Sequence, residues 1–194
     1  MKSLPEPNLK GQMSVEEAIA RRRSVREFTR APLTERELGQ LLWAAQGITD
    51  RARGFRAAPS AGATFPLETY VATLGGIFRY RPDKHALEPV RAGDTRRALA
   101  AAALGQRWIE SASAVIVFTA VPERTTRRYG SRGLMYIHME AGHAAENLHL
   151  QAVAMGLGSA PVGAFDEAAV AKILNLTKTE TPLYLIPVGK EARK

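Results

Sequence analysis

The sequence predicts an α+β fold in one domain spanning residues 1–194, and three observations lead to that class. Capping-box spacings precede two amphipathic stretches near the N-terminus. Apolar runs bounded by Gly, Pro and Asp predict several strands, and a long helical pattern occupies Gly133–Met155. The predicted strands mix with helices without a strict βαβ rhythm, which favours α+β over α/β.

The N-terminal third contains the two capped helices. The first is expected over about 14–23, because Ser14 and Glu17 have capping-box spacing. The second starts at Thr34 and ends near Gly47, which can close it. Residues 1–12 are polar, contain proline and lack the apolar core of a signal peptide, so we expect a flexible arm there.

A breaker-rich basic stretch, "TDRARGFRAAPSAGATFP", follows the second helix. Its many Gly, Pro and Ser residues predict a long loop without regular structure, and long loops in compact domains are often functional. After it, "LETYVATL" and "IFRY" form a predicted hairpin across Gly75 and Gly76, and "ALEPV" returns as a further strand. Asp94 can cap a helix through "TRRALAAAALG", and "SAVIVFTAV" predicts a buried strand.

The long helix of Gly133–Met155 carries apolar residues on more than one side. This pattern predicts burial nearly all round. Gly142 and the neighbouring alanines would permit close approach of another helix, in this chain or in a second subunit. Beyond it, "LGSAPVG" predicts a short strand and loop, Asp166 caps a short helix, and "PLYLIPVGK" predicts the last strand.

Composition limits the function classes. The chain has 27 Lys and Arg against 19 Asp and Glu, a net charge of +8, so its surface should attract anions. It has no cysteine, which excludes a disulfide framework, a thiolate nucleophile and a Cys-based zinc site. Any redox chemistry therefore requires a cofactor. The sequence contains no run of about 18 apolar residues that would predict a membrane-spanning helix.

A basic cluster at the end of the first helix is the first candidate site. Arg22, Arg23, Ser24 and Arg26 offer guanidinium and hydroxyl donors that match phosphate oxygens. Cations in a last helical turn also complement the helix dipole, so a purely structural role stays open.

Three further segments are candidates, each with an ordinary structural alternative. The small residues of "APSAGA" would let a flat ligand approach the backbone, or form a surface turn. The segment "APVGAF" offers unobstructed backbone amides, or a plain strand-to-helix connection. Lys190 and Arg193 add positive charge near the C-terminus, which can equally be solvated charge.

The long helix also carries three histidines and two glutamates, which are residue types that bind metal ions. None of its histidine pairs has the i, i+4 spacing of a helical zinc motif, although His143, Glu146 and His149 lie close in angle. The sequence therefore predicts no metal site, without excluding one. The aromatic residues are scattered in apolar contexts and are interpreted as core.

Four motifs in order resemble the FMN-dependent nitroreductase family, and within it the SagB-type dehydrogenases. They are "RRSVREF", "PSAGATFPLE", "YIHMEAGHAAENLHLQAVAMGLGSAPVGAF" and "LIPVGK", and the resemblance covers about Met13 to the end. It implies a nitroreductase-like three-layer α/β/α sandwich with a central mixed sheet. It also implies a homodimer that shares the long central helix, with two FMN sites at the interface.

The resemblance assigns cofactor-binding roles and no catalytic side chain. It implies phosphate and ribityl contacts for Arg22, Arg23 and Ser24, and a pyrimidine-edge contact for Arg26. Gln106 would also face that edge, and one backbone N–H of the Pro161–Ala164 turn would face the flavin N5 atom. The remaining residues that it implies are Pro59, Ser60, Ala61, Gly62 and Ala63 from the partner subunit, Val162 and Gly163 within that turn, and Gly189, Lys190 and Arg193 at the C-terminal phosphate site.

The function expected from this resemblance is a cytoplasmic FMN oxidoreductase. NAD(P)H would reduce the flavin by hydride transfer and a nitroaromatic or quinone would reoxidise it, in a ping-pong scheme. An alternative is oxidation of azoline rings in modified peptides, as in SagB-type relatives; the "GGIFRYRPDKHALEPV" hairpin belongs to their pattern. Another class of hypothesis is a polyanion- or nucleic-acid-binding module, suggested by the charge and by "RRRSVR" and "DRARGFR".

Overall fold

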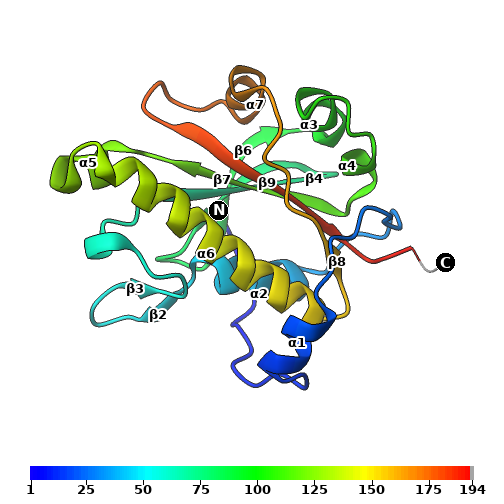
Figure 1. Cartoon of the computed structure of the whole chain (residues 1–194). Coiled ribbons are helices and arrows are strands. Elements are labelled where there is room, and N and C mark those ends of the chain that lie inside the picture. Colours follow the sequence, from blue (N-terminus) through cyan, green and yellow to red (C-terminus); the bar gives the residue numbers. More distant parts are fainter. Residues whose placement is uncertain (193–194) are drawn as a thin grey trace.

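The protein is an α+β sandwich in which a seven-stranded sheet is covered by helices on both faces (Figure 1). The computed structural model describes residues 1–192. In spatial order the strands are β1 (Lys2–Ser3), β6 (Ala86–Ala92), β5 (Gly76–Arg81), β4 (Leu67–Thr73), β7 (Ala114–Ala120), β9 (Thr181–Gly189) and β8 (Gly158–Ser159). All pairings between these strands are antiparallel, and a parallel bridge joins Ser24 to Ser159.

Two helical layers cover the sheet. One contains α1 (Val15–Arg21), α2 (Glu35–Gln46) and the long α6 (Arg132–Ala154). The other contains α3 (Arg96–Ala102), α4 (Trp108–Ser111) and α7 (Glu167–Leu174). A short hairpin of β2 (Ile48–Asp50) and β3 (Phe55–Arg56), a 3-10 turn η1 (Ala61–Ala63) and α5 (Glu123–Tyr129) lie beside the α6 layer (Figure 1).

The central strand β7 organises the core. Its sequence AVIVFTA is buried at every position, because β4 and β9 flank it and helices cover both faces. Ile116 and Phe118 join the core on the α6 side, whereas Val115 and Val117 pack toward α3 and α7. The continuous apolar run thus gives a doubly covered strand, as predicted.

Helix capping follows the sequence signals. Thr34 and Glu37 form a reciprocal capping box at α2, and Asp166 accepts from the N–H of Ala169 at 2.9 Å at α7. Ser14 accepts from the N–H of Glu17 at 3.1 Å. At α3 the prediction was shifted by one residue: Thr95 is the N-cap, and Asp94 instead accepts from Arg96.

Several local features differ from the expectations. The stretch expected to be an irregular loop contains the β2–β3 hairpin and η1, and α4 and α5 were not predicted. Residues 1–12 were expected to be a flexible arm, yet Lys2–Ser3 pairs with β6 and Leu4 is buried. Backbone pairing with β6 and the buried side chain of Leu4 therefore hold this segment against the sheet, although its polar composition is typical of a flexible arm.

The long helix α6 is buried on one side only within this chain. Ala144, Leu148 and Ala152 are fully buried against the sheet. The opposite side of α6 is exposed, so the predicted burial nearly all round is wrong for the single chain. We call this exposed side the α6 stripe. It consists of Leu134, Met135, His138, Met139, Gly142, His143 and Glu146. Among residues 1–192, no helix combines the length and apolar character needed to cross a bilayer.

Candidate functional site

A basic segment, residues 22–29, lies beside the ends of two strands. It begins where α1 ends, and the N–H of Val25 donates to the carbonyl of Ser159 in β8 at 3.0 Å. Further on, the N–H of Thr29 donates to the carbonyl of Lys190 at 2.8 Å, just after β9. Three segments that are distant in the sequence are thereby brought together, as the candidate site requires.

Two glycines allow this close packing. A Cβ on Gly158 would lie 2.6 Å from a methyl group of Val25, closer than van der Waals contact allows. A Cβ on Gly189 would lie 2.9 Å from the backbone nitrogen of Ser113. Gly189 therefore has a packing role at this place, since β8 pairs with β9 through Gly158 and Gly189.

The cationic groups of the basic segment have few internal partners. The closest carboxylate to Arg22 is that of Glu146, with Nε 3.9 Å from Oε1. Arg23 donates to the carbonyls of Ala20 and Arg22 at 3.1 and 2.7 Å. Within residues 1–192, Arg23 has no carboxylate within 4 Å, so its charge is available to an external anion.

Arg26 is held by an aromatic ring. Its guanidinium carbon lies 5.7 Å from the ring centroid of Trp108, an arrangement that stabilises a cation through the ring quadrupole. Trp108 also packs against Phe28, with centroids 6.3 Å apart. Gln106, just before α4, donates from Nε2 to the carbonyl of Ala103 at 3.0 Å. Trp108, which was interpreted as a core residue, therefore links Gln106 and α4 to the basic segment.

A buried histidine lies beneath the basic segment. His149 of α6 is 4% exposed, and its Nδ1 lies 2.8 Å from the hydroxyl oxygen of Ser159. Burial, with a smaller contribution from the charge of Arg22, lowers the pKa of His149 to about 4, so the ring is neutral near pH 7. Its Nε2 has no hydrogen-bond partner in the described part of the chain. Buried polar atoms are normally paired, so this one indicates a group that the chain itself does not supply.

The turn Pro161–Ala164 presents free backbone donors. Val162 exchanges hydrogen bonds with Leu185, at 2.8 and 3.0 Å, and Pro161 has no N–H. The N–H groups of Gly163 and Ala164 have no acceptor among residues 1–192, and both residues are exposed. If one amide of this turn contacts a ligand, it is therefore that of Gly163 or Ala164.

The loop Pro59–Ala63 lies elsewhere on the chain. Gly62 has a φ of +59°, and a Cβ there would lie 2.5 Å from the hydroxyl oxygen of Tyr129 in α5. The side chain of Arg128 reaches the Gly62 carbonyl at 3.5 Å. The loop packs against α5 and α6, and within one chain it makes no recorded hydrogen bond to the basic segment.

Next to this loop, α6 carries a buried carboxyl group. Glu140 is 3% exposed, and burial raises its pKa to about 7, although Ser60 and the charge of Arg56 act in the opposite direction. Its Oε1 has no hydrogen-bond partner in the region that the structure covers. The carboxyl group is therefore mostly protonated below about pH 7 and mostly ionised above it.

The nitroreductase family model matches residues 19–190, most of the chain. This chain belongs to the nitroreductase family. A protein of Methanocaldococcus jannaschii is 44% identical over 186 residues, covering 93% of this chain and 92% of its own length. A crystal structure from Ralstonia eutropha has a TM-score of 0.91 and 32% identity, over all of this chain and 90% of that one. Both are described as "putative nitroreductase".

A third relative bears on the branch of the nitroreductase family. The microcin B17-processing protein McbC of Escherichia coli is 27% identical over 165 residues, covering 79% of this chain and 61% of its own. This match supports the SagB-type branch that the motifs suggested. The family assignment makes the chain a nitroreductase-family oxidoreductase.

The nitroreductase chain thus brings most predicted site residues into one place. The segment that carries Arg22, Ser24 and Arg26 contacts Ser159 and Lys190, and the Pro161–Ala164 turn follows Ser159 and pairs with β9 at Leu185. Gln106 lies two residues before Trp108, whose ring contacts Arg26. The loop Pro59–Ala63 is separate, and Arg193 lies outside the described residues. Within residues 1–192, no group of three or more His, Asp or Glu side chains is arranged to hold a metal ion.

Sequence reasoning missed Ser159 and considered His149 only as a metal ligand. Ser159 stands inside the motif "GLGSAPVG", so the motif itself was the available signal. The pairing of Ser159 with His149 depends on how β8 packs against α6, which no local pattern encodes.

Proposed function

We propose that this protein is an FMN-dependent oxidoreductase of the nitroreductase type. Members of this family typically use FMN with NAD(P)H. The proposal includes a homodimer with two flavin sites and, because NAD(P)H is the donor, a cytoplasmic location. The observation that carries it is that the basic segment and Lys190 meet at the paired ends of β8 and β9, while the free amides of the Pro161–Ala164 turn lie further along β9, beside Leu185.

The residues present fit a flavin phosphate and its polar chain. Arg22 and Arg23 supply guanidinium donors that no close carboxylate neutralises in the described chain, and such donors bind phosphate in a paired geometry. Ser24 adds a hydroxyl, and the unpaired Nε2 of His149 lies below the same segment. We also assign Lys190 and Arg193 to phosphate binding.

Each remaining assignment has a physical role. The ring of Trp108 fixes Arg26, so that its charge can stabilise negative charge on the pyrimidine edge without reorganisation. Gln106 supplies an amide to the same edge. The N–H of Gly163 or Ala164 orients the reactive edge of the ring. Pro59–Ala63 would come from a second copy, because this loop lies apart from the basic segment of its own chain.

When bound, FMN supplies the redox chemistry, accepting a hydride from NAD(P)H and delivering it to a nitroaromatic or quinone. The chain is then required to bind, orient and shield the reactants rather than to provide a nucleophile. This agrees with the absence of cysteine from the sequence. Glu140, neutral below about pH 7, is a buried proton carrier next to Ser60 in the proposed flavin-facing loop.

The α6 stripe supports the proposed dimer. Leu134, Met135 and Met139 are each 45–49% exposed, and a Cβ on Gly142 would contact no other atom. Large apolar side chains next to a flat glycine surface favour helix-to-helix contact with another copy. Nitroreductase-family proteins are generally dimeric.

A second candidate function is the oxidation of azoline rings in modified peptides. The similarity to McbC, a microcin B17-processing protein, favours it. The two reactions differ in their electron flow, since a peptide substrate would reduce the flavin in place of NAD(P)H. Binding of nucleic acid or another polyanion is a third reading of the +8 charge, and it predicts binding that weakens steeply with salt.

Steady-state turnover tests the leading proposal. Purified protein is supplied with FMN, and oxidation of NADH and NADPH is followed with a quinone or a nitroaromatic acceptor. We expect parallel lines in double-reciprocal plots, because the donor product leaves before the acceptor binds. FMN-loaded protein that oxidises neither nucleotide with any such acceptor would show the proposed activity to be wrong.

A further inference from the structure

A second basic pocket lies at the ends of β4 and β5, apart from the basic segment. Its cavity volume is about 340 Å³, and the β2–β3 hairpin contributes to its wall. The charged residues that line it are Arg56, Arg79, Arg81, Arg124, Glu68 and Asp83. None of these residues belongs to the proposed flavin site.

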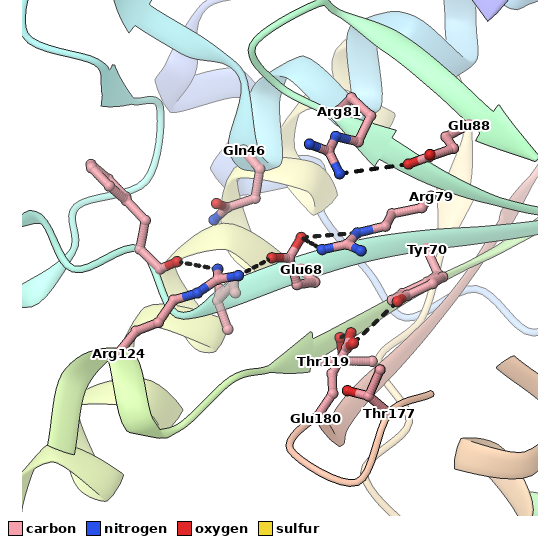
Figure 2. Close-up of polar contacts among 12 residues, drawn as sticks. Gln46, Glu68, Tyr70, Arg79, Arg81, Glu88, Thr119, Arg124, Thr177 and Glu180 are labelled. Carbon is pink, nitrogen blue, oxygen red and sulfur yellow. Dashed lines mark hydrogen bonds and ion pairs between the residues drawn. The ribbon is translucent and has the colours of Figure 1, made fainter. Parts of the chain in front are cut away.

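Two of the four arginines share one carboxylate. Arg79 donates to Oε2 of Glu68 from Nε and Nη2, at 3.2 and 2.8 Å, and Arg124 Nη2 lies 2.6 Å from Oε1 (Figure 2). Arg124 also donates to the carbonyl of Phe65 at 3.0 Å. Glu68 therefore holds both guanidinium groups in place but balances only one of their two charges.

Arg81 is held loosely at the rim. Its Nε lies 3.7 Å from Asp83 Oδ1, and its Nη1 lies 3.5 Å from Glu88 Oε2. Its side chain is 37% exposed, and both separations are longer than a good charged hydrogen bond. Arg81 can therefore turn toward a bound anion without losing a strong contact.

Arg56 carries a charge without a carboxylate partner. Its Nη1 donates to Oε1 of Gln46 at 2.7 Å and to the carbonyl of Leu67 at 3.3 Å, and its guanidinium carbon lies 4.8 Å from the ring centroid of Phe65. No Asp or Glu oxygen within residues 1–192 comes within 4 Å of it. Partial burial lowers the pKa of Arg56, and the charges of Glu68 and Glu140 act in the opposite direction. An arginine stays protonated in proteins, so this partly buried cation without a contacting carboxylate favours an added anion.

Gln46 provides a second unsatisfied donor. It is 1% exposed, its Oε1 accepts from Arg56, and its Nε2 has no partner in the described chain. In Figure 2 the Gln46 amide is directed toward the Glu68–Arg124 pair. Gln46 is not among the residues that line the pocket, so its contribution there is to hold Arg56 in place through its Oε1.

We propose that this pocket binds a phosphate dianion, either free or as the monoester group of a small molecule. The four guanidinium groups outnumber the carboxylates that contact them, those of Glu68, Asp83 and Glu88, so the pocket keeps a net positive charge that favours an anion. The planar donors of arginine suit tetrahedral oxyanions. A pocket of about 340 Å³ admits one such group rather than a nucleic-acid backbone. The run "DRARGFR", which contains Arg56, thereby has a role apart from flavin binding.

Calorimetric titration of phosphate into the FMN-saturated protein in low-salt buffer tests this proposal. Bound FMN fills the phosphate position of the flavin site, and the variant Arg22→Ala reports any residual contribution from that site. We expect one saturable phosphate per chain. Its affinity should fall about tenfold in Arg81→Gln and at least as much in Arg56→Met, and it should be unchanged in Arg22→Ala and in the exposed control Arg97→Gln.

A variant that binds phosphate more tightly than the parent cannot be explained by loss of folding. Asp83→Asn removes one negative charge from the rim, so phosphate should bind several-fold more tightly. Adenosine 2′-phosphate, with adenosine as control, distinguishes the two sources. Tighter binding than that of phosphate assigns the pocket to a nucleotide monoester, and equal binding assigns it to the free ion.

Two results would overturn the proposal. One is the absence of saturable phosphate binding in the FMN-saturated protein. The other is binding that Arg22→Ala abolishes while Arg56→Met, Arg81→Gln and Asp83→Asn leave it unchanged. Arg56, Arg81 and Asp83 line this pocket and lie outside the proposed flavin site, so a change of phosphate affinity in their variants is attributed to this pocket whether or not the proposed FMN chemistry is right.

Discussion

His149 Nδ1 lies 2.8 Å from the hydroxyl oxygen of Ser159, and this contact joins the long helix α6 to the short strand β8. The backbone carbonyl of the same Ser159 accepts from Val25, at the centre of the basic segment. One residue therefore connects the central helix with the arginines proposed to hold the flavin phosphate.

Replacing His149 should change how stability depends on pH. The pKa of His149 falls from 6.5 to about 4 on folding, mainly because of burial. Between these values the unfolded chain binds a proton that the folded chain does not, so stability is lost as the pH falls from 6.5 to 4. For one proton the slope approaches about 1.4 kcal/mol per pH unit. In His149→Gln this part of the slope should be absent in urea unfolding between pH 4.5 and 7.5. The exposed His138→Gln is the control, and an unchanged slope in His149→Gln would contradict the assignment.

Glu140 should make folding stability depend on pH in the opposite direction from His149. Its pKa rises from 4.5 to about 7 on folding, mainly because of burial. Between these values the unfolded chain is ionised and the folded chain is protonated, so stability falls as the pH rises from 4.5 to 7. Glu140→Gln keeps the shape without the charge, and it should be more stable than the parent at pH 8 by about 3 kcal/mol. Urea unfolding at pH 5 and pH 8 measures this, with the exposed Glu110→Gln as control. A variant less stable than the parent at pH 8 would show that the carboxylate is instead well stabilised.

Gly158→Ala tests whether close packing positions the basic segment. The added methyl would lie 2.6 Å from a Val25 methyl, so the segment has to move. Overpacking of this kind destabilises by about 1–3 kcal/mol. We expect FMN affinity to fall at least tenfold, because Ser24 and Arg26 flank Val25 and Arg22 lies three residues before it. Flavin fluorescence titration measures the affinity, and Gly11→Ala, where the methyl has ordinary contacts, serves as control. Wild-type affinity in a folded Gly158→Ala protein would argue against this role.

The α6 stripe should form the dimer interface. Met139 is 49% exposed in the single chain and lies one turn from Gly142. Met139→Glu places a charge there, so the protein should become monomeric and lose FMN, because Pro59–Ala63 would no longer reach the site. Light scattering with size-exclusion chromatography measures the mass, and the exposed Thr179→Glu is the control. A dimeric Met139→Glu protein would place the interface elsewhere.

The elements that the sequence predicts well are those with strong local signals. Thr34 and Glu37 specify a helix start by themselves, and the apolar run of β7 specifies a strand covered on both faces. The β2–β3 hairpin and α5 carry no comparable signal, because loops rich in Gly, Pro and Arg resemble irregular structure. The exposed side of α6 was also unpredictable, since its methionines and leucine resemble core residues until the packing is known.

The candidate site also combines features that the sequence predicts with features that depend on packing. The arginines and the "APVG" turn stand in motifs and were named from the sequence. The unpaired Nε2 of His149, the neutral Glu140 and the pocket around Arg56 depend on contacts between distant segments. Gln46 at the end of α2 and Arg56 of β3, for example, meet only because the β2–β3 hairpin turns the chain back toward the end of α2.

The measurement that tests the central claim most directly is the FMN content of the purified protein. The parent, the double variant Arg22→Ala with Arg26→Ala, and the exposed control Arg91→Ala with Arg97→Ala are incubated with FMN and desalted. The cofactor is then released by heat and identified by mass, and thermal unfolding confirms that each protein is folded. We predict one FMN per chain in the parent and the control, and little or none in the Arg22, Arg26 variant. A parent that holds no FMN even when it is supplied in excess would contradict the account.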